Sequence, residues 1–175
     1  GYLVELLEDI DPLIVERAIV AAGNLHDPRL VNILVEKLAI ASLQGVTRVS
    51  LRHFGEAALY DLDTGLTSPE ATRQEKNHII ETIKEIGGGQ AIEILLRHLE
   101  IAQPELRHKV RLSLAQLHFQ AEPDDQYIFV NTLDEEVQLI TWLLSAIVDL
   151  QDEPRFERLH AALASELKVR LDGML

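Results

Sequence analysis

The sequence predicts an all-α protein built as an array of short helical repeats. Three glycines, Gly23, Gly55 and Gly87, lie at equal intervals of 32 residues, and each separates two stretches with helical periodicity. A fixed period of this size is typical of helical repeat arrays. Apolar residues make up 47% of the chain but aromatic residues only 5%, a Leu-, Ile-, Ala- and Val-rich composition that favours packed helices over sheets.

The prolines predict where the helices begin. All six stand at the start of an apolar-periodic run, and most follow an acidic residue or a serine that can accept a hydrogen bond from the first free amides. The pairs are Asp11-Pro12, Asp27-Pro28, Ser68-Pro69, Gln103-Pro104, Glu122-Pro123 and Glu153-Pro154. We therefore expect a helix to start at each proline, with Ser68 as the cap of the helix that follows it.

From these starts and the apolar periodicity we expect seven helices before residue 120. In order, they cover residues 12–23, 28–42, 46–54, 56–63 or 56–66, 69–86, 90–102 and 104–119. Gly87, Gly88 and Gly89 lie between the fifth and sixth helices. Because no Lys-Ser/Thr pair follows and no strand precedes them, we interpret them as a helix-ending turn rather than a phosphate-binding loop.

The pattern changes after residue 119, where longer helices replace the short repeats. Residues 123–150 form one long helix or two abutting ones, and a last helix runs from Pro154 to at least Leu171. We therefore divide the chain into short helical repeats, 1–119, and a C-terminal long-helix cap, 120–175, which continues the same stack as part of a single domain.

Composition and charge exclude several classes of protein. With no cysteine, the chain has no disulfide, thiolate metal site or cysteine nucleophile. The net charge of −13 argues against a nucleic-acid partner, and residues 120–175 hold 12 acids against 4 bases, a balance of −8. We find neither a signal peptide nor about 18 consecutive apolar residues, which a membrane helix would need. The start at Gly1 without Met indicates a fragment of a longer protein.

Residues 11–38 resemble a HEAT-like repeat of the short kind found in phycobilisome-lyase-type proteins. The resemblance rests on four features: Asp11-Pro12, the step Val15-x-Arg17-Ala18, the ending Ala22-Gly23, and the second pair Asp27-Pro28. The next two units keep the glycine and the apolar pattern but lose the Asp-Pro pairs. The resemblance implies a right-handed α-solenoid of antiparallel helix pairs, whose second helices line the usual binding face.

The order of segments is also similar to the soluble HEAT domain of bacterial membrane proteins fused to a nucleotide-translocase-like transporter. There, a closing segment similar to Phe156-Glu157-Arg158-Leu159 follows the longer helices. This resemblance implies a cytoplasmic module, placed at the cytoplasmic face of a membrane by segments outside this chain.

The chain carries no pattern typical of an enzyme, a metal site or a cofactor site. His98, His108 and His118 are each ten residues apart, so they do not share a helix face, and no His-Glu pair of the kind found in metal-dependent HEAT hydroxylases is present. No serine lies in a Gly-x-Ser-x-Gly setting. We therefore expect no catalytic, metal-binding or cofactor-binding residues.

One cluster of bases departs from the acidic balance. It combines Arg97, Arg107 and Arg111 with Arg48 and Arg52 from an earlier repeat, and His98, His108 and Lys109 lie among them. Such a strip could bind a carboxylate or phosphate on a partner. The alternative, which the sequence favours, is that these bases pair along their helices with Glu93, Glu100 and Glu105.

Trp142 is the only tryptophan, in a segment whose polar residues Gln138, Thr141, Ser145 and Asp149 recur at helical spacing. Since the rest of that helix is apolar, we expect Trp142 to be a buried core or capping residue; the alternative is an exposed binding anchor.

Taken together, these patterns predict a non-enzymatic scaffold that mediates protein–protein interaction or regulation within a larger bacterial protein. Its candidate partner-binding residues are Arg48, Arg52, Arg97, Arg107, Arg111 and Trp142. The alternative is a bilin lyase-type subunit that binds a phycobiliprotein and a tetrapyrrole. The absence of cysteine and the few aromatic residues give this alternative little support.

Overall fold

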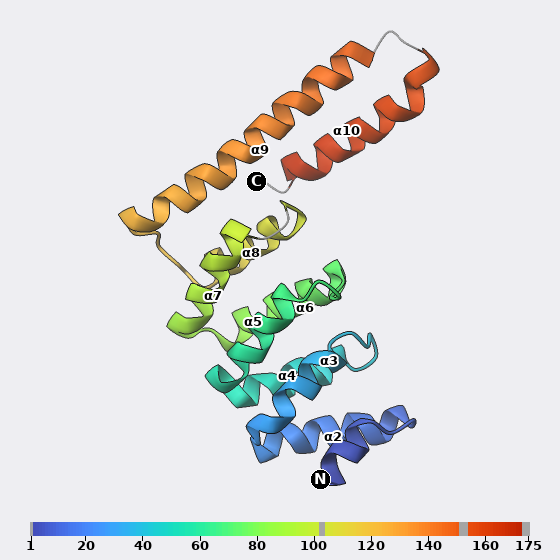
Figure 1. Ribbon diagram of the computed structural model, residues 1–175, viewed down its shortest axis with the longest axis vertical. Coiled ribbons are helices and arrows are strands. Elements are labelled where there is room, and N and C mark those ends of the chain that lie inside the picture. The colour runs from blue at the N-terminus through green and yellow to red at the C-terminus, as the bar shows by residue number, and fades with distance from the viewer. Residues whose placement is uncertain (1, 102–103, 151–153, 173–175) are drawn as a thin grey trace. The chain divides into compact units, whose positions relative to one another are not determined.

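The computed structural model describes residues 2–101, 104–150 and 154–172, and every regular element in these ranges is helical (Figure 1). The predicted all-α class is confirmed for this part of the chain. The chain divides into two compact units, one ending at Phe119 and the other starting at Gln120. Whether the second unit continues the stack of the first stays a prediction. The predicted turn at Gln103 lies outside the described residues.

The first unit holds eight α-helices within the described residues. They are α1 (Tyr2–Leu7), α2 (Pro12–Leu25), α3 (Val31–Lys37), α4 (Gln44–Phe54), α5 (Leu59–Thr67), α6 (Arg73–Ile86), α7 (Gly88–Ile101) and α8 (Pro104–Gln116). Single 3-10 turns, Pro28–Leu30 and Gly55–Ala58, precede α3 and α5. Helix α1 is a feature that the sequence patterns did not predict, and α3 is much shorter than the predicted span 28–42.

Local capping explains where most helices begin. The carboxylate of Asp11 accepts a hydrogen bond from Leu13 N at 2.9 Å, and that of Asp27 accepts one from Arg29 N at 3.1 Å, as predicted. The predicted start at Pro69 is wrong, because α6 begins at Arg73. There Thr72 and Glu75 form a capping box, in which each side chain accepts a hydrogen bond from the backbone amide of the other residue.

The three equally spaced glycines have two different structural roles. Gly55 and Gly87 follow α4 and α6 with φ of 56° and 70°, so they end these helices as predicted. Gly23 instead lies inside α2, which continues to Leu25, and a Cβ atom there would stand 2.9 Å from the Cα of Ser50 on α4. Gly23 therefore serves close helix packing rather than helix termination.

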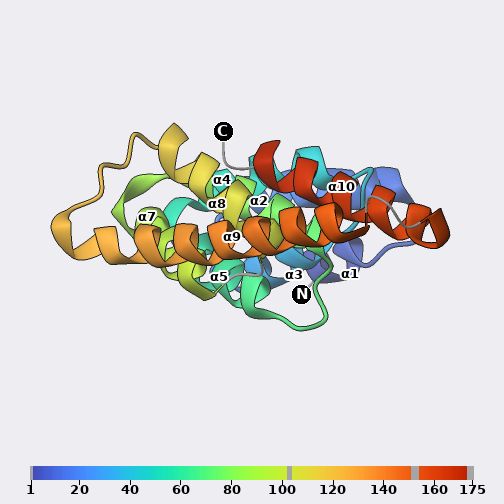
Figure 2. The ribbon, with the colours of Figure 1, turned by 90° about the horizontal axis from the view of Figure 1, so that it is seen from above.

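The helices of the first unit pack in two rows. In one row α2 contacts α4, α4 contacts α6 and α6 contacts α8; in the other, α3 contacts α5 and α5 contacts α7 (Figures 1 and 2). The fully buried side chains between them include Ile19, Leu34, Leu51, Leu62, Ile83, Leu95 and Leu114. From α2 to α8, each helix thus contacts the next but one of this unit, which brings residues about one repeat apart side by side.

The second unit is a pair of helices, α9 (Pro123–Leu150) and α10 (Glu157–Asp172), which pack on each other. Helix α9 is uninterrupted, which decides between the two predicted alternatives for residues 123–150. A 3-10 turn, Pro154–Phe156, precedes α10, so the last α-helix starts three residues later than predicted. Within the described residues, no helix has the length and apolar character needed to cross a membrane.

Candidate functional site

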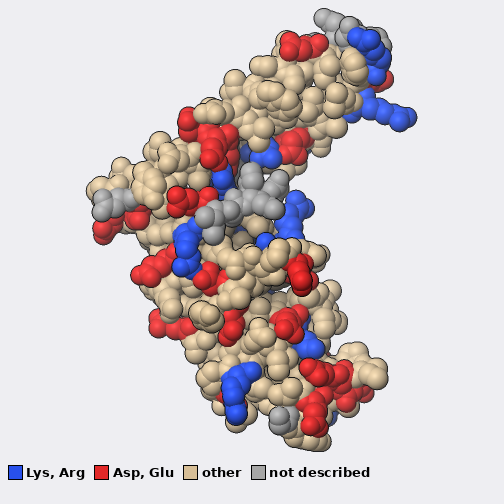
Figure 3. Space-filling model, in the orientation of Figure 1, with Lys and Arg blue, Asp and Glu red and all other residues tan. Residues whose placement is uncertain are grey.

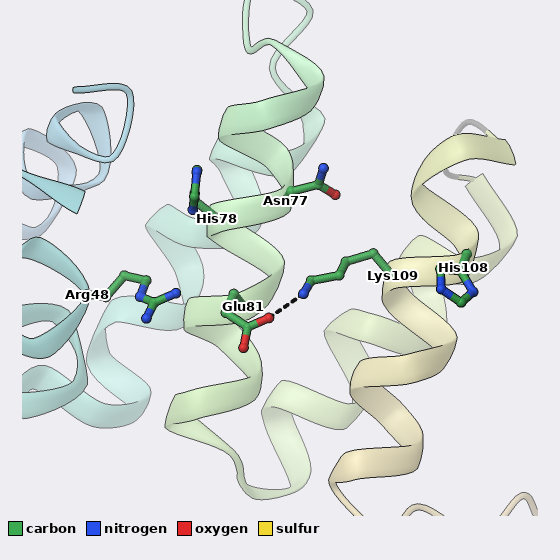
Figure 4. A pocket seen from close by; sticks show the side chains of 6 residues that line it. All are labelled: Arg48, Asn77, His78, Glu81, His108 and Lys109. Atoms are coloured by element: carbon green, nitrogen blue, oxygen red, sulfur yellow. Dashed lines mark ion pairs between the residues drawn. The ribbon is translucent and has the colours of Figure 1, made fainter. Parts of the chain in front are cut away.

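A cavity of about 480 Å³ opens on the row formed by α4, α6 and α8 (Figure 4). Its walls are Arg48 from α4, Asn77, His78 and Glu81 from α6, and His108 and Lys109 from α8. Residues 77, 78 and 81 share one side of α6 because residues one turn apart on a helix are neighbours. Figure 4 shows Arg48 and Lys109 reaching from opposite sides toward Glu81 on the central helix.

The carboxylate of Glu81 holds two lysines at the centre of the cavity. Its Oε2 lies 2.5 Å from Nζ of Lys109, and its Oε1 accepts a hydrogen bond from Lys84 one turn along α6. Burial alone would raise the pKa of Glu81, but the hydrogen bonds from Lys109 and Lys84 outweigh it and lower the pKa to about 2. Glu81 is therefore ionised at neutral pH and ties α6 to α8.

Arg48 makes one described ion pair and has a further donor group without a partner among the described residues. Its Nη2 lies 3.3 Å from Oε1 of Glu85, yet its Nε is buried without a hydrogen-bond partner among the described residues. Oγ1 of the neighbouring residue Thr47 is also buried without a hydrogen-bond partner among the described residues, and Thr47 as a whole is fully buried. Because Nε of Arg48 is buried, the part of Arg48 that a ligand can reach is the rest of its side chain, which is 33% exposed.

The charges around the cavity leave a local positive excess on an acidic protein. Of the charged side chains that line it, two are the cations Arg48 and Lys109 and one is the carboxylate Glu81, while the whole chain has a net charge of −13. His78 and His108 add two more groups that can donate hydrogen bonds. The arrangement can bind a carboxylate or a phosphate group, because guanidinium and ammonium groups are the usual protein ligands of both.

The structure separates the predicted basic strip into two places. Arg48 and Arg52 lie on α4 and Arg107 and Arg111 on α8, all in the row that carries the cavity. Arg97 lies on α7 in the other row, where its Nη2 is 2.5 Å from Oδ2 of Asp63 on α5. The strip is therefore not one continuous surface, because neighbouring helices alternate between the rows.

The ion pairs described for these bases run between helices rather than along them. Arg48 pairs with Glu85, Lys109 with Glu81, and Arg97 with Asp63. The pairing that the sequence favoured, in which Glu93, Glu100 and Glu105 pair with bases of the same helix, does not account for these three ion pairs. The physical reason is the row packing, which places a helix beside the next but one in the chain.

The sequence patterns missed the contribution of α6 to the cavity. No sequence pattern marks Asn77, His78, Glu81 or Lys84 as site residues. The structure places His78 on the wall of the cavity between Arg48 and Lys109. The spacing of residues 77, 78 and 81 indicates that they share one side of a helix. Only the tertiary packing shows that this side faces α4 and α8.

Trp142 is 59% exposed, so the prediction of a buried core or capping residue is wrong. The polar residues named above explain this result, since Trp142 lies one turn from both Gln138 and Ser145 on α9 and shares their side of the helix. Its use as an exposed anchor for a partner stays a prediction.

Comparison with known proteins does not assign the chain to a family. No protein-family model matches the chain, and no curated protein is similar to it at a significant level. In the part of the chain that the structure describes, no group of three or more His, Asp or Glu side chains could hold a metal ion.

Proposed function

We propose that this chain is a non-enzymatic HEAT-like repeat module, a right-handed α-solenoid that binds another protein. It would work as the cytoplasmic part of a larger bacterial protein, as the resemblance to transporter-associated HEAT domains implies. The contact of each helix with the next but one supports a repeat stack, because stacking of neighbouring units is what defines such arrays.

The observation that carries the proposal is the cavity on α4, α6 and α8. The side chains of Arg48 and Lys109, each 33% exposed, face each other across Glu81. A carboxylate or phosphate on a partner protein would pair with the guanidinium of Arg48 and share Lys109 with Glu81. Arg52 is exposed on α4 of the same row and supplies further positive charge for docking, whereas Arg107 on α8 is buried.

Site-specific photocrosslinking in the cells of origin tests the proposal. A photoreactive residue is placed at Asn77, on the wall of the cavity, and a control one at Glu16, which is exposed on α2. We expect a protein adduct from position 77 and none from position 16. Lys109→Glu and Arg48→Glu should each remove the adduct, whereas Arg17→Glu on the exposed surface of α2 should leave it.

Thermal unfolding of each variant separates lost binding from lost folding. An adduct from position 77 that survives both charge reversals in folded protein would contradict the role of the cavity. Adduct formation from positions 16 and 77 alike would show a partner that does not depend on this site.

A further inference from the structure

A groove of about 490 Å³ lies where α3, α5 and α6 meet (Figure 1), and among the described residues it shares no lining residue with the cavity on α4, α6 and α8. Its apolar lining includes Val35 on α3, Ile79 on α6, and Ala39 and Ala71 in the turns beside these helices. The volume lies in the usual range for small-molecule sites, about 300–1,000 Å³. We call this site the α3–α5 groove.

Gly65 on α5 keeps the apolar part of the groove open. A Cβ atom at this position would stand 2.9 Å from Cδ1 of Ile79 and 3.2 Å from Cγ1 of Val35, so a side chain here would fill space beside both of them. Ile79 is buried and Val35 is half-buried, and together they form the floor of the groove. A ligand would therefore meet an apolar floor to which three helices contribute.

The charged side chains that line the α3–α5 groove are all carboxylates, and no Lys, Arg or His is among its described lining residues. The four are Glu36, Asp61, Glu70 and Glu75. None of them forms an ion pair within the part of the chain that the structure describes. Glu81 in the other cavity, by contrast, is paired with two lysines. The α3–α5 groove thus combines an apolar floor with negative charge that has no internal countercharge in the described ranges.

Asp61 is the carboxylate for which this arrangement is least favourable. It lies half-buried in the first turn of α5, and its side chain has neither a hydrogen bond nor an ion pair among the described residues. Burial raises the pKa of its carboxyl group, because removal from water disfavours the charged form. A cation beside Asp61 would favour the ionised form and offset this cost.

The hydroxyl in the lining also suits a ligand that donates hydrogen bonds. Thr64 Oγ1 donates its one hydrogen to the carbonyl of Tyr60 at 3.0 Å, so it can offer a ligand only its lone pairs. The side-chain amide of Asn32 already donates to Oε1 of Glu36 at 3.3 Å. An ammonium group carries N–H donors and no acceptor, so it matches this lining.

The carboxylates and the apolar floor together select the kind of cation. A single ammonium group would leave three of the four carboxylates without a countercharge, and a strongly hydrated metal ion such as Mg²⁺ would gain nothing from an apolar floor. An aliphatic polyamine carries several ammonium groups joined by methylene segments. Its methylenes can pack on Val35 and Ile79 while its ammonium groups pair with the carboxylates.

The charge of the first unit favours the approach of such a cation. Residues 1–119 hold 17 acids against 12 bases, and Figure 3 shows acidic side chains, in red, covering more of the drawn face of this unit than basic ones, in blue. A negative field raises the local concentration of cations. We propose that the α3–α5 groove binds an aliphatic polyamine, with its ammonium groups on the four carboxylates and its methylene segments on the apolar floor. The proposal does not depend on the anion-binding role of the other cavity.

Isothermal titration calorimetry with spermidine, a triamine, measures the binding in about 0.15 M NaCl, where salt screens general attraction to an acidic surface. We expect saturable binding of one spermidine per chain. Asp61→Asn should weaken it at least about fivefold, because it removes a half-buried countercharge. The variant should still fold, since Asp61 loses no partner among the described residues. Glu16→Gln, which removes the same charge from the exposed surface of α2, should change the affinity by less than about twofold.

Ala39→Trp tests the shape of the groove without changing its charge. Ala39 is exposed and lines the groove, so the larger side chain should obstruct it and weaken spermidine binding at least about fivefold in a protein that thermal unfolding shows to be folded. Unchanged affinity in this variant, or equal weakening by Glu16→Gln and Asp61→Asn, would show general attraction to an acidic surface. Tighter binding of a tetralysine peptide than of spermidine would assign the groove to protein side chains. Each of these results, or the lack of saturable binding, overturns the proposal.

Discussion

Oδ1 of Asp63 on α5 lies 2.7 Å from Nε2 of His98 on α7, and the same carboxylate pairs with Arg97 at 2.5 Å. Only 6% of the His98 side chain is exposed, so this contact satisfies a buried polar group between helices that are next but one in the chain. The interaction is the counterpart, in the second row, of the link that Glu81 makes between α6 and α8.

Removing this carboxylate should destabilise the first unit. Asp63→Ala leaves the buried imidazole of His98 without its partner, so we expect the free energy of unfolding to fall by about 1–3 kcal/mol. Urea denaturation measures the change. Glu93→Ala, an exposed position on α7, is the control and should shift the midpoint by much less. An equal loss in the free energy of unfolding for the two variants would show that the contact between Asp63 and His98 does not stabilise the protein.

Glu81 should make the stability of the protein sensitive to acid. Its pKa is about 2 in the folded protein against an ordinary value of 4.5, so the unfolded chain binds a proton more readily than the folded one. The stabilisation is present above pH about 4.5 and is lost as pH falls toward 2, with a total of up to about 3 kcal/mol.

Urea denaturation between pH about 6 and about 3 checks this expectation. In the Glu81→Gln variant the loss of stability over that range should be smaller than in the original protein. Glu16→Gln, which alters an exposed carboxylate on α2, should leave the slope unchanged. Parallel stability curves for Glu81→Gln and the original protein would exclude Glu81 as a source of the acid sensitivity.

Gly23 should not tolerate a side chain. A Cβ atom there would stand 2.9 Å from Cα, Cβ and Oγ of Ser50, so Gly23→Ala forces α2 and α4 apart. We expect a loss of about 1–3 kcal/mol in the free energy of unfolding. Gly45→Ala is the matched control, because this helical glycine on α4 has open space at its Cβ position, and there the change should stabilise by about 0.5–1 kcal/mol. A neutral Gly23→Ala variant would contradict the close approach.

Thr72, and not Ser68, should act as the main cap of α6. Thr72→Ala removes the capping box with Glu75 and should cost about 1 kcal/mol. Ser68 Oγ accepts only a 3.3 Å hydrogen bond from Glu70 N in the preceding bend, so Ser68→Ala should cost less. Thermal unfolding of the two variants compares them. A larger loss at Ser68 would support a helix start at Pro69.

The sequence by itself determined the features that depend on neighbours within about one helical turn. The hydrogen bonds of Asp11 and Asp27 to the first amides of their segments, the helix ends at Gly55 and Gly87 and the all-helical class follow from local backbone chemistry. Two local patterns could have started α6: Ser68-Pro69 and the capping box of Thr72 and Glu75. The helix begins after Thr72, where the capping box supplies two hydrogen bonds.

Tertiary structure alone decided which residues meet. Lys109 reaches Glu81 and Arg97 reaches Asp63 because alternate helices share a row, and no pattern in the chain states that residues 28 or 34 positions apart will be neighbours. The same packing gave Gly23 a role different from that of Gly55. In the second unit, the packing of α10 on α9 leaves Trp142 exposed, although its helix is largely apolar. Periodicity specifies which side of a helix is apolar, but the position of a second helix decides how much of that side is covered.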